Sequence, residues 1–145
     1  MVRSKRLSPV LKLAETDERN AAQSMAQTRQ RLHYYEEKLS ELCGFRKEYE
    51  NSLRADQTHI TSTSQLQQYQ SFLRQLDEGI AMISEKISSQ KQLTSRDEQQ
   101  WLITKQRTDA LDKLVLKLQG VERNLRENRE ANELDELSQR VKNRL

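Results

Sequence analysis

The sequence contains few of the residues that end or bend helices. Its 145 residues include three Gly and one Pro, and this composition favours long uninterrupted helices over a fold that needs many turns. Hydrophobic residues make up only 34% of the chain. That fraction is too low for the thick core of a globular domain, but it can fill a thin seam between helices. We therefore expect an all-α protein.

Further absences narrow the function classes. Cys43 is the only cysteine, so no intramolecular disulfide can form, and a reduced, cytosolic setting is the simplest account. No signal peptide is evident, and no apolar run approaches the roughly 20 residues of a membrane span. The sequence shows no Gly-rich phosphate loop, no metal-ligand spacing and no nucleophile motif. We therefore predict that the protein is not an enzyme and that it takes no metal, cofactor or small-molecule substrate.

The charged residues argue against nucleic-acid binding. The 25 basic and 22 acidic residues are mixed along the chain, as on the solvated flanks of a coiled coil. A nucleic-acid binder usually gathers its basic residues on one face near stacking aromatic residues. A basic helix pair that binds nucleic acid is a weaker alternative, and only the basic ends of the chain support it.

A periodic stretch between Leu66 and Leu118 determines the expected fold. Its members are spaced alternately three and four residues apart, and most are apolar. This spacing keeps one stripe of a long helix facing a partner helix, and it is the evidence against disorder. The members are Leu66, Tyr69, Leu73, Leu76, Ile80, Ile83, Ile87, Gln90, Thr94, Asp97, Trp101, Thr104, Thr108, Leu111, Val115 and Leu118.

A second stripe with the same spacing precedes the first. It consists of Leu11, Ala14, Glu18, Ala21, Met25, Thr28, Leu32, Tyr35, Leu39, Leu42, Arg46, Tyr49 and Leu53. Ser8 and Pro9 suit a helix start, and Ser62 or Ser64 can begin a capping box with the Gln three positions later. We therefore predict one coiled-coil domain over 1–145, an antiparallel two-helix hairpin whose second helix is the longer. Its parts are a helix at about 9–55, a turn at 56–64, a helix at about 65–121 and a less regular helical tail at 122–145.

The predicted pairing places residue i opposite about residue 119 − i. Large apolar residues then meet near the turn, where we expect tight packing, and small or polar residues meet farther away, where we expect softer packing. In this pairing the first helix does not extend far enough to lie opposite the apolar group Leu111, Leu114, Val115 and Leu118. A foreign partner could cover this group, and so could residues 1–10, the C-terminal tail folding back, or a second copy of the chain.

The two Phe residues mark one edge of the predicted hairpin. Phe45 and Phe72 both fall immediately before a seam position and at nearly the same height. They either pack on each other and broaden the core or form an exposed aromatic anchor beside the small residue Gly79. We favour the exposed anchor, because charged residues normally occupy such edges.

Several segments together resemble the FliJ family of flagellar export proteins, which are stalk proteins of type III export systems. The segments are Leu11 to Glu15, Glu36 to Leu39 continuing to Tyr49, Tyr69 to Phe72 with Leu76, and Trp101 followed by basic residues and an apolar helix. The resemblance covers most of residues 10–118. Lys38, Gly79 and Ile83 depart from the family pattern.

The resemblance implies a cytoplasmic, non-enzymatic component that works at the cytoplasmic face of the inner membrane. Its implied partners are the export ATPase hexamer, the cytoplasmic domain of the export gate and export chaperones. The gate-binding edge of the family maps onto Leu42, Phe45, Tyr49, Phe72 and Leu76, and we assign Leu111, Leu114, Val115 and Leu118 to the ATPase ring. The alternative is an architectural coiled coil that dimerises or scaffolds and has no ATPase partner.

Overall fold

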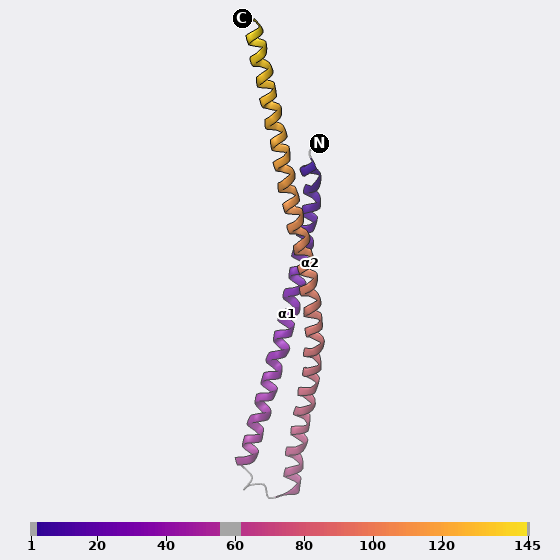
Figure 1. Cartoon of the computed structure of the whole chain (residues 1–145). Coiled ribbons are helices and arrows are strands. Elements are labelled where there is room, and N and C mark those ends of the chain that lie inside the picture. Colours follow the sequence, from indigo (N-terminus) through magenta and orange to yellow (C-terminus); the bar gives the residue numbers. More distant parts are fainter. Residues whose placement is uncertain (1–2, 56–61, 145) are drawn as a thin grey trace. The chain divides into compact units, whose positions relative to one another are not determined.

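Two long helices make up the computed structural model, which describes residues 3–55 and 62–144. Helix α1 spans Arg3–Ala55 and helix α2 spans Thr63–Arg144 (Figure 1). The fold is all-α, with two helices packed against each other and the second the longer, as the seam pattern predicts. No described helix is apolar enough over a sufficient length to cross a membrane.

The N-terminus of α2 is capped by Ser62. The backbone N–H of Gln65 donates to the Ser62 hydroxyl at 3.2 Å, and the N–H of Leu66 donates to the Ser62 carbonyl at 3.4 Å. The first of these is the bond of an N-cap serine to the third helical residue, so Ser62, the earlier of the two predicted N-caps, begins the helix. Thr63 and Ser64 belong to α2, whereas residues 56–61 of the predicted turn lie outside the described residues.

Both helices extend farther than the local sequence signals predict. Helix α1 begins at Arg3, and Pro9 lies inside it, although Ser8 and Pro9 read as its start. A proline near the N-terminus removes an N–H from the ladder, which costs little in the first turn and more beyond it. Helix α2 runs through Gly120 without interruption to Arg144, and no glycine in the described residues has a positive φ.

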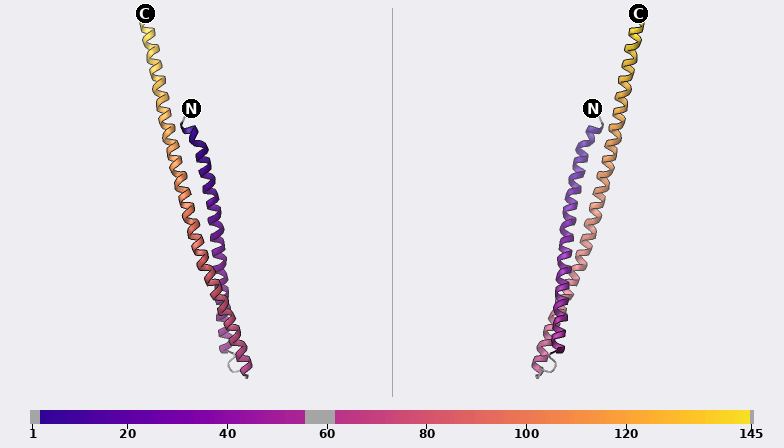
Figure 2. Two further views of the ribbon diagram at one scale, coloured as in Figure 1. Left: turned by 90° about the vertical axis from the view of Figure 1, so that its right-hand side faces the viewer. Right: turned by 90° about the vertical axis from the view of Figure 1, so that its left-hand side faces the viewer.

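The described residues divide into two compact units, Ala22–Gln100 and Met1–Ala21 with Trp101–Leu145. Within Ala22–Gln100 the two helical segments lie side by side and antiparallel (Figures 1 and 2). The Tyr49 ring packs on Phe72, and Lys86 lies over the Tyr35 ring. Each of these pairs has residue numbers that add to 121, so the register differs by about two residues from the predicted pairing.

Burial in the unit Ala22–Gln100 is greatest away from the turn. Ile87, Gln90 and Thr94 are buried, whereas Leu66 is 41% exposed. The Gln90 amide and the Thr94 hydroxyl both donate to the Thr28 carbonyl, at 3.2 and 3.4 Å. Side chains of α2 thus reach the backbone of α1 at this height. The expectation of softer packing in the polar part is therefore not what the burial shows.

In the unit Met1–Ala21 with Trp101–Leu145, α1 covers the seam face of α2 as far as Glu122. Ser4, Ala14, Thr104 and Thr108 are buried, and Leu111, Val115 and Leu118 are half-buried. Helix α2 continues past the beginning of α1 (Figure 2), and residues 123–144 are all exposed. The seam face of the apolar group is thus covered by the chain's own first helix, which starts earlier than predicted.

Candidate functional site: an aromatic groove on one edge of the helix pair

The aromatic edge consists of positions that immediately precede seam residues on both helices. On α1 these positions are 34, 38, 41, 45, 48 and 52, and on α2 they are 72, 75, 79, 82 and 86. In an antiparallel pair such positions from both helices lie along the same side of the seam. Phe45 and Phe72 are therefore brought to one edge, as the heptad pattern predicts, because the 3–4 spacing persists in both helices.

A groove of about 450 Å³ lies between the helices at this edge. It is lined by Phe45, Glu48, Tyr49, Ser52, Phe72 and Leu76. The Tyr49 ring lies 4.5 Å from Phe72 and 5.4 Å from Tyr69, centroid to centroid and tilted in both pairs. Phe45 is 59% exposed and Phe72 is 43% exposed. The groove thus presents two aromatic side chains to solvent over a half-buried tyrosine.

The predicted gate-binding residues fall into two kinds in the structure. Phe45 and Phe72 are exposed, whereas Leu42, Tyr49 and Leu76 are half-buried seam residues. Leu42 lies beneath Gly79, since a Cβ built on Gly79 would lie 3.8 Å from Leu42 Cδ1. Four of the five residues line the groove directly, and Leu42 continues its floor toward Gly79.

An exposed ion pair links the two helices beside the groove. Arg46 occupies a seam position, and its guanidinium binds Asp77 of α2 at 2.5 Å and also Glu50. The hydrogen bond to Asp77 raises the pKa of Arg46. Arg46 thus links α1 to α2 at the height of the groove.

Two further edge residues form an ion pair on α1. Lys38 donates to Glu41 at 3.2 Å, and its Nζ lies 5.4 Å from the centre of the Tyr34 ring. The hydrogen bond to Glu41 raises the pKa of Lys38. For Tyr49, burial is the main cause of a raised pKa, with the nearby Tyr69 second. The phenol of Tyr49 thus stays neutral to a higher pH than that of a fully solvated tyrosine.

The apolar group assigned to the ATPase ring lies in the other unit and is only partly accessible. Leu111, Val115 and Leu118 face the seam, whereas Leu114 is 42% exposed. Leu111 also lines a shallow groove of about 460 Å³ with Val10, Leu13, Ala14, Asp17, Arg107 and Ala110. The accessible apolar surface here therefore comes from both helices, and the sequence pattern of α2 alone did not indicate the α1 residues.

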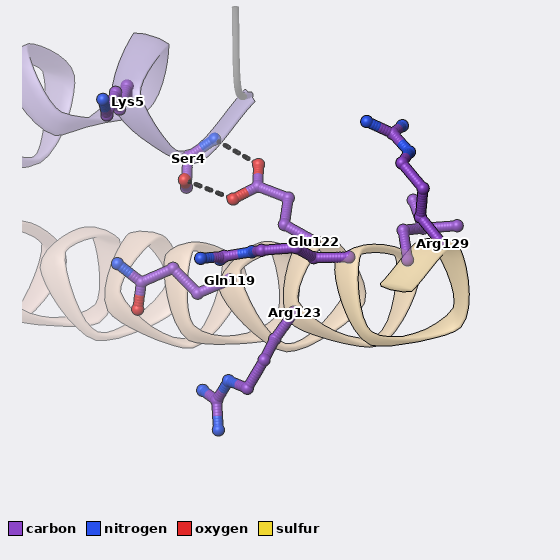
Figure 3. Close-up of a pocket in the computed structure, with 8 residues that line it drawn as sticks. Ser4, Lys5, Gln119, Glu122, Arg123 and Arg129 are labelled. Carbon is purple, nitrogen blue, oxygen red and sulfur yellow. Dashed lines mark hydrogen bonds between the residues drawn. The ribbon is translucent and has the colours of Figure 1, made fainter. Parts of the chain in front are cut away.

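A carboxylate on α2 caps the N-terminus of α1 in the same unit. Glu122 accepts hydrogen bonds from the Ser4 backbone N–H at 3.1 Å and from the Ser4 hydroxyl at 2.7 Å (Figure 3). The nearby Arg123 and Arg129 side chains point in different directions (Figure 3), so these basic residues do not converge on one point. Only the continuation of both seam patterns, to Ser4 and to Glu122, could have indicated this contact.

The chemistry of a metal or acid–base site is not assembled in residues 3–55 and 62–144. They hold no group of three His, Cys, Asp or Glu side chains placed to bind a metal ion. Exposed His33 pairs with Glu37 at 2.9 Å, and Cys43 is exposed.

The fold and the groove together define an antiparallel helix pair with exposed aromatic side chains on one edge. The family model described as flagellar FliJ protein matches residues 4–144, so the chain belongs to the flagellar FliJ family. This family is a non-enzymatic component of the flagellar protein export apparatus. No curated protein and no solved structure gave a significant match.

Proposed function

We propose that this protein is the stalk of the flagellar export ATPase and connects the ATPase to the export gate. The exposed Phe45 and Phe72 on one edge of the helix pair are the observation that supports the gate contact most directly. Exposed aromatic side chains beside a groove are typical anchors of protein interfaces. In this proposal the aromatic groove binds the cytoplasmic domain of the gate.

The ATPase contact belongs to the unit Met1–Ala21 with Trp101–Leu145. We assign it to Leu111, Leu114, Val115 and Leu118. Leu114 is accessible on the helix pair, and the three seam residues support the surface from which it projects. Insertion of this unit into the hexamer would promote assembly of the ring. Export chaperones would bind the same protein at the cytoplasmic face of the inner membrane.

The gate contact is tested by Phe72→Ala. The Phe72 ring is partly exposed and outside the seam, so its removal should weaken binding of the purified gate domain by about tenfold or more while helicity stays the same. Calorimetric titration measures the affinity, and circular dichroism measures the fold. Leu116→Ala is the matched control, because Leu116 is an exposed apolar residue on the other unit.

Unchanged affinity of the Phe72→Ala variant for the gate domain would contradict the proposed gate contact. Extensive unfolding of that variant would instead show that Phe72 serves the core of the helix pair.

A further inference from the structure

We propose that the last part of α2, residues 127–144, is a self-association surface that binds the same segment of a second copy of the chain in antiparallel orientation. Leu134, Leu137 and Val141 are 64%, 56% and 59% exposed. They are spaced three and four residues apart, so they form one apolar stripe along the helix. The inference goes beyond the proposed function, which assigns no partner to these three residues.

The stripe does not continue the seam that packs against α1. Leu134 follows the seam residue Leu118 by sixteen residues, which at about 100° per residue turns its side chain by about 160° around the helix. The contact of Ser4 with Glu122 marks the beginning of α1, and Leu134 lies about 18 Å beyond that contact along α2. Helix α2 continues past the beginning of α1 (Figure 2), so α1 does not cover the stripe.

The charges along this segment favour a second copy in antiparallel orientation. Its charged residues are mainly acidic in the first part and basic in the last part. In order, they include Glu127, Glu130, Glu133, Asp135 and Glu136, then Arg140, Lys142 and Arg144. A parallel pair would place carboxylates beside carboxylates, whereas an antiparallel pair places the acidic part of each copy beside the basic part of the other. The segment is therefore complementary to itself.

The apolar stripe sets the register of this pair. Placing Leu134 opposite Leu137 of the second copy pairs positions whose numbers add to 271. Glu133 of each copy then flanks the contact close to Arg140 of the other, and each contact occurs twice because the pair has twofold symmetry. Neither Glu133 nor Arg140 forms an ion pair within the described residues, so both groups can bind the second copy.

The size of the surface makes the association weak. Three apolar side chains on each copy bury much less than the roughly 1,200 Å² of a stable interface. We therefore expect a monomer at micromolar protein concentration and a substantial fraction of dimer as the concentration approaches about 1 mM. At the micromolar concentrations of a thermal melt the segment is unpaired and adds nothing to the Tm.

Sedimentation equilibrium of the full-length protein, from about 10 μM to about 1 mM, tests the surface. The wild type should shift from monomer toward dimer, and Leu137→Glu should raise the dissociation constant at least about tenfold. Leu125→Glu is the matched control and should dimerise like the wild type. Leu125 is 60% exposed and, nine residues before Leu134, lies on the opposite side of the helix.

A charge exchange tests the antiparallel orientation. Glu133→Lys and Arg140→Glu should each weaken the dimer, and the double variant should restore it, because the two charges are then only exchanged between the copies. A dimer that the double variant does not restore would contradict this orientation.

Cross-linking gives a second test of orientation. In a Cys43→Ser background, an air-oxidised mixture of Leu134→Cys and Leu137→Cys chains should form mainly the mixed disulfide. A preference for disulfides between identical positions would overturn the antiparallel pairing. A wild type that stays monomeric at every concentration, or a Leu137→Glu variant that dimerises like the wild type, would overturn the self-association surface itself.

Discussion

Gly79 is a residue whose replacement by alanine should make the protein more stable. A Cβ at this position would meet Leu42 Cδ1 at 3.8 Å, an ordinary van der Waals distance, and glycine inside a helix is less stable than alanine by about 0.5–1 kcal/mol. Gly79→Ala should therefore raise the free energy of unfolding by about that amount, as measured by chemical denaturation. Gly44→Ala is the reference for helix propensity alone and should give a similar gain, because a Cβ there meets nothing within 4 Å. A less stable Gly79→Ala variant would contradict this packing.

Tyr49 should make the stability depend on pH in the alkaline range. Burial raises the pKa of Tyr49 above its ordinary value of 10.0. The folded protein therefore favours the neutral phenol, so the stabilisation is complete below the unfolded pKa and is lost as pH rises through the folded pKa. The Tm should fall above pH 10.0, and Tyr49→Phe should reduce that fall. Thermal melts at neutral and alkaline pH measure both. An equal fall in the two proteins would rule out Tyr49 as the cause.

At the scale of the element, the beginning of α1 depends on a residue of α2. Glu122 binds the Ser4 N–H and hydroxyl and so satisfies donors that every helix N-terminus leaves open. Glu122→Ala should accelerate hydrogen exchange in the first turn of α1 and cost about 0.5–2 kcal/mol of stability, as the loss of an N-cap does. Glu127→Ala, an exposed site one turn beyond the contact, should change neither. Unchanged exchange in Glu122→Ala would contradict the capping role.

The elements differ in how far the sequence predicts them. Every predicted seam residue except Leu66 is at least half-buried, because a sustained 3–4 spacing leaves a helix only one face for its partner. The same spacing predicts that Phe45 and Phe72 share one edge of the helix pair. The start of α1 at Arg3 could not be predicted locally, because it depends on a contact between residues 118 apart in the sequence. Pro9 and Gly120 are residue types that often mark the ends of helices, but both lie inside helices here.

The candidate site was likewise only partly predictable. The heptad positions indicate which residues share an edge, but not that the Tyr49 ring packs on Phe72 or that Arg46 binds Asp77. Those contacts depend on the two-residue difference in register and on rotamers. Leu111, Val115 and Leu118 were predicted from their apolar pattern, and the pattern left open whether residues 1–10, another part of the protein or a partner covers their seam face.

At the scale of the whole molecule, the last part of α2 should contribute little to stability. Residues 123–144 are all exposed, so their deletion removes little buried apolar surface. A variant ending at residue 122 should keep the Tm of the full chain, with a helical signal lower only by the share of the deleted residues. Circular dichroism and a thermal melt measure both. A large drop in Tm would mean that this segment packs against another surface, for example a second copy of the chain.

The measurement that tests the stalk function most directly is the turnover rate of the cognate export ATPase with and without this protein, together with the sedimentation profile of the mixture. The proposal predicts a higher turnover rate and a peak of hexamer size that contains the protein. An unchanged rate with no complex, from a protein whose circular dichroism shows it to be fully helical, would contradict it and would leave an architectural coiled coil as the better account.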